Sequence, residues 1–141
     1  MVTMAKFKLR RYEEFEDESG RTVRYRRGEA GGLVADDARV AIDAVVGDQA
    51  WVDPGARVDA GARIGARSWV ESGAVVGAGV RIESEVHLGR DVIVGAGARI
   101  GPRVTVGEGA RIGDGAEVPP DARVPAGAVV LRGREHLALA A

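Results

Sequence analysis

Residues 97–118 read GARIGPRVTVGEGARIGDGAEV, and an aliphatic residue recurs in this stretch at every sixth position. The same step of six continues in both directions, so that every sixth residue from Val34 to Val130 is valine, isoleucine or leucine. Four residues after each aliphatic position comes a small or β-branched residue, most often alanine. An unbroken period of this kind indicates an internal structural repeat.

The order of residues within each hexad fits the alternation of side chains along a short strand. The aliphatic residue and the small residue two positions before it point inward, and the residue between them points outward. The two positions in front of the small residue form a corner, and the second of them is frequently glycine, which tolerates positive φ because it has no Cβ. Three hexads close one 18-residue coil, so residues 34–129 make a little over five coils.

This pattern resembles the hexapeptide-repeat superfamily, of the bacterial transferase-hexapeptide type, and the resemblance covers about two thirds of the chain. The family fold is a left-handed parallel β-helix. We therefore predict an all-β, single-domain left-handed parallel β-helix of about five 18-residue coils over residues 33–135. An open sandwich or a helical bundle does not accommodate so many unbroken steps of six.

The first 32 residues lie outside the repeat and hold four of the six aromatic residues, Phe7, Tyr12, Phe15 and Tyr25. Strand-like segments over residues 6–12, 13–17 and 22–26, with a turn at residues 18–20, predict an N-terminal β-hairpin. An open coil end exposes unpaired backbone groups. We therefore expect residues 1–32 to form a cap that packs its aromatic side chains over the first coil.

The two ends carry weaker signals. Phe7-Lys8-Leu9 and Gly31-Gly32-Leu33-Val34, with the hairpin between them, are similar to the opening of an uncharacterised bacterial family of hexapeptide-repeat acetyltransferases. At the other end the repeat stops, and residues 136–141 are expected to form a tail that closes the last coil.

Composition excludes several classes of protein. Lysine and arginine number 20 against 21 acidic residues, which argues against a general electrostatic grip on nucleic acid or anionic membranes. The chain has no cysteine, so it has neither disulfides nor a cysteine-based zinc site. It also shows no apolar run of membrane-spanning length and no secretory leader, which favours a cytoplasmic protein.

Residues 18 apart should stack in columns on the outside of the coils. One column contains the tryptophan strip, Trp51 and Trp69, followed by His87. A second contains the aliphatic patch, Val75 and Ile93. Exposed apolar strips usually mark interaction sites, and family members are commonly trimers. We therefore expect a homo-oligomer, preferably a trimer, in which the tryptophan strip meets the aliphatic patch of a neighbour.

A third column holds the arginine ladder, Arg63, Arg81 and Arg99. Its functional interpretation is an anion site for the phosphates of a nucleotide or coenzyme. The alternative is that each arginine pairs with a nearby carboxylate, such as Asp59, Glu71 or Asp53.

His87 is the candidate catalytic residue. Hexapeptide-repeat acyltransferases typically use a histidine as general base in a cleft between subunits, which implies the same role for His87, with Glu83 or Glu85 orienting its ring. However, His87 stands within a strand rather than in a turn, and the repeat carries no inserted substrate-covering loop. A γ-class carbonic anhydrase is excluded because only one histidine lies in the coils, so no metal site is expected.

Two functional hypotheses remain. The unbroken coils and the position of His87 favour a non-catalytic assembly or scaffold module that self-associates through its flat faces and needs no cofactor. The resemblance favours a small acyltransferase that uses acyl-CoA as co-substrate and has its site between subunits of a trimer. His87→Ala discriminates between the two hypotheses.

Overall fold

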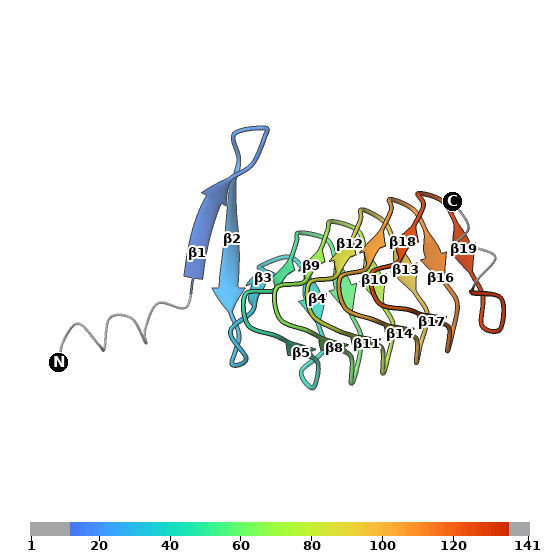
Figure 1. The fold of residues 1–141 in the computed structure, drawn as a ribbon. Coiled ribbons are helices and arrows are strands. Elements are labelled where there is room, and N and C mark those ends of the chain that lie inside the picture. Colours follow the sequence, from blue (N-terminus) through green and yellow to red (C-terminus); the bar gives the residue numbers. More distant parts are fainter. Residues whose placement is uncertain (1–11, 136–141) are drawn as a thin grey trace.

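The computed structural model describes residues 12–135 and shows a stack of coils with a β-hairpin at its N-terminal end (Figure 1). Phe7, most of the predicted strand over residues 6–12, and the predicted tail over residues 136–141 lie outside the described residues. The hairpin consists of β1 (Tyr12–Glu16) and β2 (Thr22–Arg27), which pair antiparallel.

Three parallel sheets form the sides of the stack. The first sheet continues from the hairpin through β3 (Leu33–Ala35), β6 (Trp51–Val52), β9 (Trp69–Val70), β12 (His87–Leu88), β15 (Thr105–Val106) and β18 (Arg123–Val124). The second sheet contains β4 (Arg39–Val40), β7 (Arg57–Val58), β10 (Val75–Val76), β13 (Ile93–Val94), β16 (Arg111–Ile112) and β19 (Val129–Val130). The third contains β5 (Val45–Val46), β8 (Arg63–Ile64), β11 (Arg81–Ile82), β14 (Arg99–Ile100) and β17 (Glu117–Val118).

The register of these sheets confirms the predicted architecture. Each strand pairs in parallel with the strand 18 residues away, as in the pairs Trp51–Trp69 and Arg63–Arg81. The chain passes through the three sheets in turn, so it winds as a parallel β-solenoid of about five coils. This arrangement is consistent with the left-handed β-helix that the sequence predicts.

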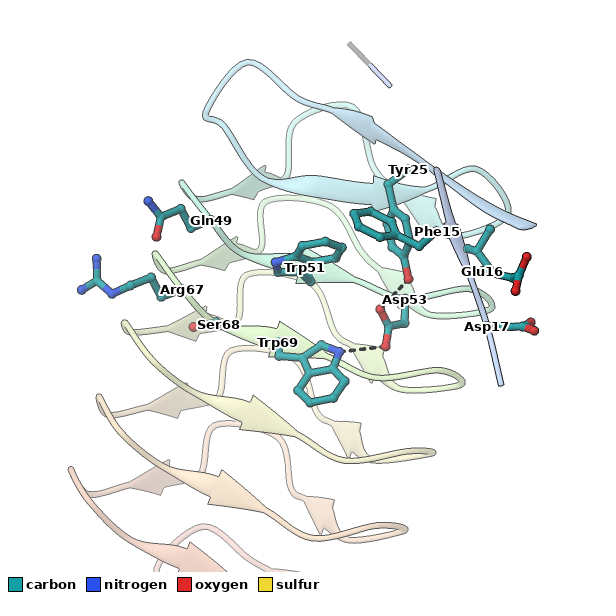
Figure 2. A pocket seen from close by; sticks show the side chains of 11 residues that line it. Phe15, Glu16, Asp17, Tyr25, Gln49, Trp51, Asp53, Arg67, Ser68 and Trp69 are labelled. Carbon is teal, nitrogen blue, oxygen red and sulfur yellow. Dashed lines mark hydrogen bonds between the residues drawn. The ribbon is translucent and has the colours of Figure 1, made fainter. Parts of the chain in front are cut away.

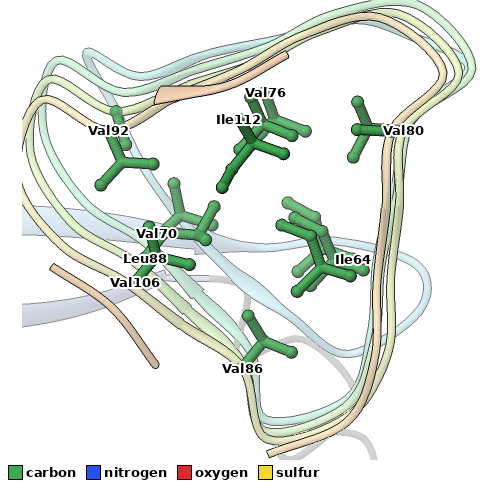
Figure 3. Close-up of a cluster of buried hydrophobic side chains, with 14 of the residues drawn as sticks. Ile64, Val70, Val76, Val80, Val86, Leu88, Val92, Val106 and Ile112 are labelled. Carbon is green, nitrogen blue, oxygen red and sulfur yellow. The ribbon is translucent and has the colours of Figure 1, made fainter. Parts of the chain in front are cut away.

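The core is a column of small aliphatic side chains that point inward from all three sheets (Figure 3). On the first sheet, for example, Val70, Leu88 and Val106 are stacked one coil apart and are at most 1% exposed. The alanines of the repeat, such as Ala62 and Ala98, are fully buried beside them. Burying a valine or leucine stabilises the fold by about 1.5–3 kcal/mol, so the repeat supplies the core without aromatic residues.

The corners explain the glycines of the repeat. Gly97, at the predicted corner position, has φ of +71°. In this left-handed region a side chain costs roughly 1–2 kcal/mol. One corner nevertheless uses larger residues with positive φ in successive coils, which are Gln49, Arg67, Glu85, Arg103 and Asp121. Their charges alternate along the stack, and Arg103 donates two hydrogen bonds to Asp121.

The hairpin lies against only one side of the first coil. β2 pairs antiparallel with β3 and so extends the first sheet, whereas β4 and β5 are the end strands of the other two sheets within residues 12–135. The hairpin aromatics also pack differently from the expected cover over the coil end. Phe15 and Tyr25 contact the outward-facing ring of Trp51, because β2 continues the outer surface of the sheet that carries it.

Candidate functional site

The most distinctive surface is the outer face of the first sheet, where the predicted column is present. Trp51, Trp69, His87 and Thr105 lie on adjacent strands in register. The rings of Trp69 and His87 are stacked, with centroids 4.6 Å apart and planes 13° from parallel. Strand pairing therefore fixes the histidine ring against a flat aromatic surface.

A carboxylate also holds His87. The Nε2 atom of His87 lies within hydrogen-bonding distance of Glu71 Oε2, while the other oxygen of Glu71 is 3.8 Å from Arg90 Nε. An ionised carboxylate only accepts hydrogen bonds, so Nε2 donates. In the neutral imidazole this leaves Nδ1 as an acceptor, which is the state a general base requires.

The partner of His87 is thus Glu71, and not Glu83 or Glu85 as the sequence suggested. Glu85 instead lies at the corner, with its carboxylate 4.0 Å from Arg67 Nε. Glu71 comes from the preceding coil, where it directly follows the strand that carries Trp69. Stacking of coils, and not proximity in sequence, brings it to the histidine.

A second carboxylate repeats this arrangement one coil earlier. Asp53 accepts a 2.7 Å hydrogen bond from Trp69 Nε1 and a 3.0 Å hydrogen bond from the Tyr25 hydroxyl (Figure 2). Burial raises the pKa of Asp53 above its usual value, although the two hydrogen bonds oppose this shift. Burial and the nearby Asp53 charge likewise raise the pKa of Tyr25.

The raised pKa of Asp53 predicts a pH-dependent contribution to stability. The folded protein binds this proton more tightly than the unfolded chain, so the contribution is greatest at acidic pH and declines as the pH rises through the folded-state pKa. Wild type should therefore be more stable relative to Asp53→Asn at pH 4 than at pH 7. Urea unfolding of both proteins at the two pH values measures this difference, and a difference that is constant or larger at pH 7 contradicts it.

The arginine ladder forms as predicted in geometry, with Arg63, Arg81 and Arg99 in register on the third sheet. The carboxylates suggested as their partners bind other groups. Asp59 accepts a 2.7 Å hydrogen bond from Arg57, and Glu71 and Asp53 lie on the first-sheet side as described above. Within residues 12–135 the three ladder arginines form no ion pair, so stacked like charges remain on this face.

The predicted interface residues differ in their accessibility. Val75 and Ile93 of the aliphatic patch are neighbours in the second sheet, and Ile93 is 38% exposed. On the tryptophan strip, Trp69 is 44% exposed, whereas Trp51 is partly covered by the hairpin of the same chain. Trp51 therefore already has an intramolecular partner.

Two general searches of the described residues gave no site or span. Between residues 12 and 135, no group of three or more histidine, aspartate or glutamate side chains is arranged to hold a metal ion. In the same part of the chain, no helix has the length and apolar character needed to cross a membrane.

The fold and repeat define a class, the hexapeptide-repeat β-helix proteins. Residues 67–102 and 85–120 match the family model described as bacterial transferase hexapeptide (six repeats), and the chain belongs to this superfamily. Comparison with curated protein sequences gave no match.

Two solved structures give a more specific likeness. One is a histidine-to-asparagine variant of perosamine N-acetyltransferase from Caulobacter crescentus in complex with CoA and GDP-perosamine, with 31% sequence identity and a TM-score of 0.70. The other is a histidine-to-alanine variant of GDP-perosamine N-acetyltransferase from the same organism, with the same ligands, 32% identity and a TM-score of 0.70. Each match covers 72% of this chain and 48% of the other, so the present chain spans about half the length of these relatives.

Proposed function

We propose that the protein is an acyl-CoA-dependent acyltransferase in which His87 is the general base. The observation that carries the proposal is the His87–Glu71 pair on an accessible face of the β-helix. The CoA-bound acetyltransferases with similar structures favour this function over a non-catalytic scaffold, which was the leading hypothesis from the sequence. The misplaced-histidine argument weakens because Glu71, from another coil, orients the ring.

The proposed chemistry is transfer of the acyl group from the CoA thioester to an amine or hydroxyl. Nδ1 of His87 accepts the acceptor's proton as its nitrogen or oxygen attacks the thioester carbonyl. Collapse of the tetrahedral intermediate then breaks the carbon–sulfur bond, and the coenzyme thiol leaves with a proton. Glu71 acts as a positioning residue, because its hydrogen bond to Nε2 keeps Nδ1 unprotonated before the reaction.

The arginine ladder is the proposed surface for the phosphates of the coenzyme. Three stacked guanidinium groups without carboxylate partners in the described chain offer repeated donors to phosphate oxygens. The ladder face adjoins the His87 face through the corner that carries Arg67 and Glu85. An extended coenzyme that bends around this corner places its thioester near the histidine.

We further propose a trimer with parallel axes as the active assembly. Ile93 and Val75 provide an exposed apolar patch on the second sheet, adjacent to the glycines Gly89 and Gly107. In the trimer this patch of one subunit faces the Trp69 side of the next and closes the cleft around His87. Closed rings of this kind use one heterologous interface repeatedly.

Calorimetric titration of acetyl-CoA, combined with absolute mass from light scattering, tests both parts. Wild type should be a discrete trimer that binds acetyl-CoA, and Arg81→Gln should weaken binding about 10-fold, because a charge-assisted hydrogen bond contributes roughly 1.5–3 kcal/mol. Arg39→Gln, which changes an exposed arginine on the second sheet, is the matched control and should leave the affinity unchanged.

Ile93→Glu tests the assembly in the same experiment. The variant should remain folded, because Ile93 points outward, but it should dissociate to monomers and lose acetyl-CoA affinity. A wild-type monomer that binds no acetyl-CoA would reject the proposed enzyme and favour a structural role.

A further inference from the structure

A pocket of about 540 Å³ lies between the hairpin and the outer face of the first sheet (Figure 2). Phe15 and Tyr25 of the hairpin line one side, and Trp51 and Trp69 line the other. These residues include both tryptophans of the chain. The pocket is built by one chain alone, since all its aromatic walls belong to the hairpin and to the first coils.

The aromatic walls are rigid and partly accessible. Phe15, Tyr25 and Trp51 contact one another with centroids 5.1–5.7 Å apart. Phe15 and Trp69 are each at least 40% exposed, so aromatic surface remains free for a ligand. Aromatic faces attract cations through the negative potential of the ring.

The polar lining of the pocket is predominantly acidic. Asp53 lies between the hairpin and Trp69, and both of its hydrogen-bond donors are neutral groups. Within the described chain no ion pair neutralises Asp53 or Glu16, which also lines the pocket with Asp17. Arg67 is the cationic lining residue, and its guanidinium lies 4.0 Å from Glu85. The pocket therefore retains net negative charge.

We propose that this pocket binds the alkylated ammonium group of a small ligand. The aromatic rings provide the cation–π surface, and Asp53 provides the opposite charge. Both oxygens of Asp53 already accept hydrogen bonds, so the site suits a methylated ammonium, which needs a nearby charge and apolar contact more than hydrogen-bond acceptors.

This site is distinct in role from the acyl transfer proposed above. A quaternary nitrogen has no lone pair and cannot be acylated, so the ammonium is a recognition group and not the acceptor atom. Trp69 separates the pocket from His87, because its ring stacks on the histidine. The inference does not require acetyl-CoA binding and stands or fails independently of it.

Intrinsic fluorescence provides a direct test, because Trp51 and Trp69 are the only tryptophans. Choline is the probe, and 3,3-dimethylbutan-1-ol, which has the same shape without the charge, is the control ligand. Choline should produce a saturable change, and the neutral alcohol should bind about 10-fold more weakly or not at all. Equal binding of the two, or no saturable change with choline, overturns the proposal.

Substitutions locate the site. Asp53→Asn should weaken choline binding about 10-fold and leave binding of the neutral alcohol unchanged, whereas Asp59→Asn on the adjacent sheet should change neither. Phe15→Leu, in the exposed hairpin, is a second variant that removes aromatic surface if Asp53→Asn fails to fold. Unchanged choline affinity in the folded variants overturns the assignment.

Discussion

Replacing Leu88 with alanine should lower the free energy of unfolding by about 4 kcal/mol, in the upper part of the range for buried leucine-to-alanine substitutions. Leu88 is fully buried in the core, between Val70 and Val106 of the adjacent coils. Hydrogen bonds between strands fix the spacing of the coils, so the neighbours cannot close the cavity. A loss of this size is a large part of the stability of a typical domain.

Leu131→Ala is the matched control for this prediction. Leu131 is 50% exposed near the last coil, so the same chemical change should cost well under 1 kcal/mol. Urea unfolding followed by circular dichroism measures both variants. Similar losses for Leu88 and Leu131 would contradict the core described here.

Replacing His87 with alanine should reduce the turnover number for acyl transfer by 10²- to 10⁴-fold, on the order of the usual contribution of a general base. The affinity for acetyl-CoA, the trimer and the unfolding midpoint should change little, because the imidazole is on the surface of the sheet and the coils continue beneath it. Steady-state release of the CoA thiol, with an amine acceptor present, measures the effect.

Glutamate variants identify the group that positions His87. Glu71→Gln should also lower turnover and alter its pH profile, because an amide does not hold the imidazole in one protonation state. Glu85→Gln is the control, since Glu85 lies near Arg67 and not near the histidine. An equal effect of the two substitutions would contradict the assignment of Glu71.

The sequence predicts the fold well because the period of the repeat directly reflects the geometry. Val70, Leu88 and Val106 are identical in role and 18 residues apart, so their stacking follows from counting. Gly97 at a positive-φ corner follows from the absence of a Cβ. The buried Ser68 also occupies a predicted inward position, where its hydroxyl donates to the Glu83 carbonyl and accepts from the Val86 amide.

The site was predicted less completely, because its contacts join residues from different coils and from the hairpin. Sequence analysis identified His87 and Trp69 but not their partners, Glu71 and Asp53. In both pairs the carboxylate lies 16 residues before the ring, one position beyond the strand of the preceding coil. This repeated spacing was a usable signal. The place of Tyr25 was not, because the path of the hairpin depends on how β2 meets β3.

Acetyl transfer itself is the most direct test of the proposed enzyme. Purified protein is incubated with acetyl-CoA and a panel of amine-bearing nucleotide sugars that includes GDP-perosamine, and the products are examined by mass spectrometry. The account predicts that at least one acceptor gains a single acetyl group in the presence of wild type and not in the presence of His87→Ala. If wild type transfers no acetyl group to any member of the panel and does not bind acetyl-CoA, the proposed function is wrong.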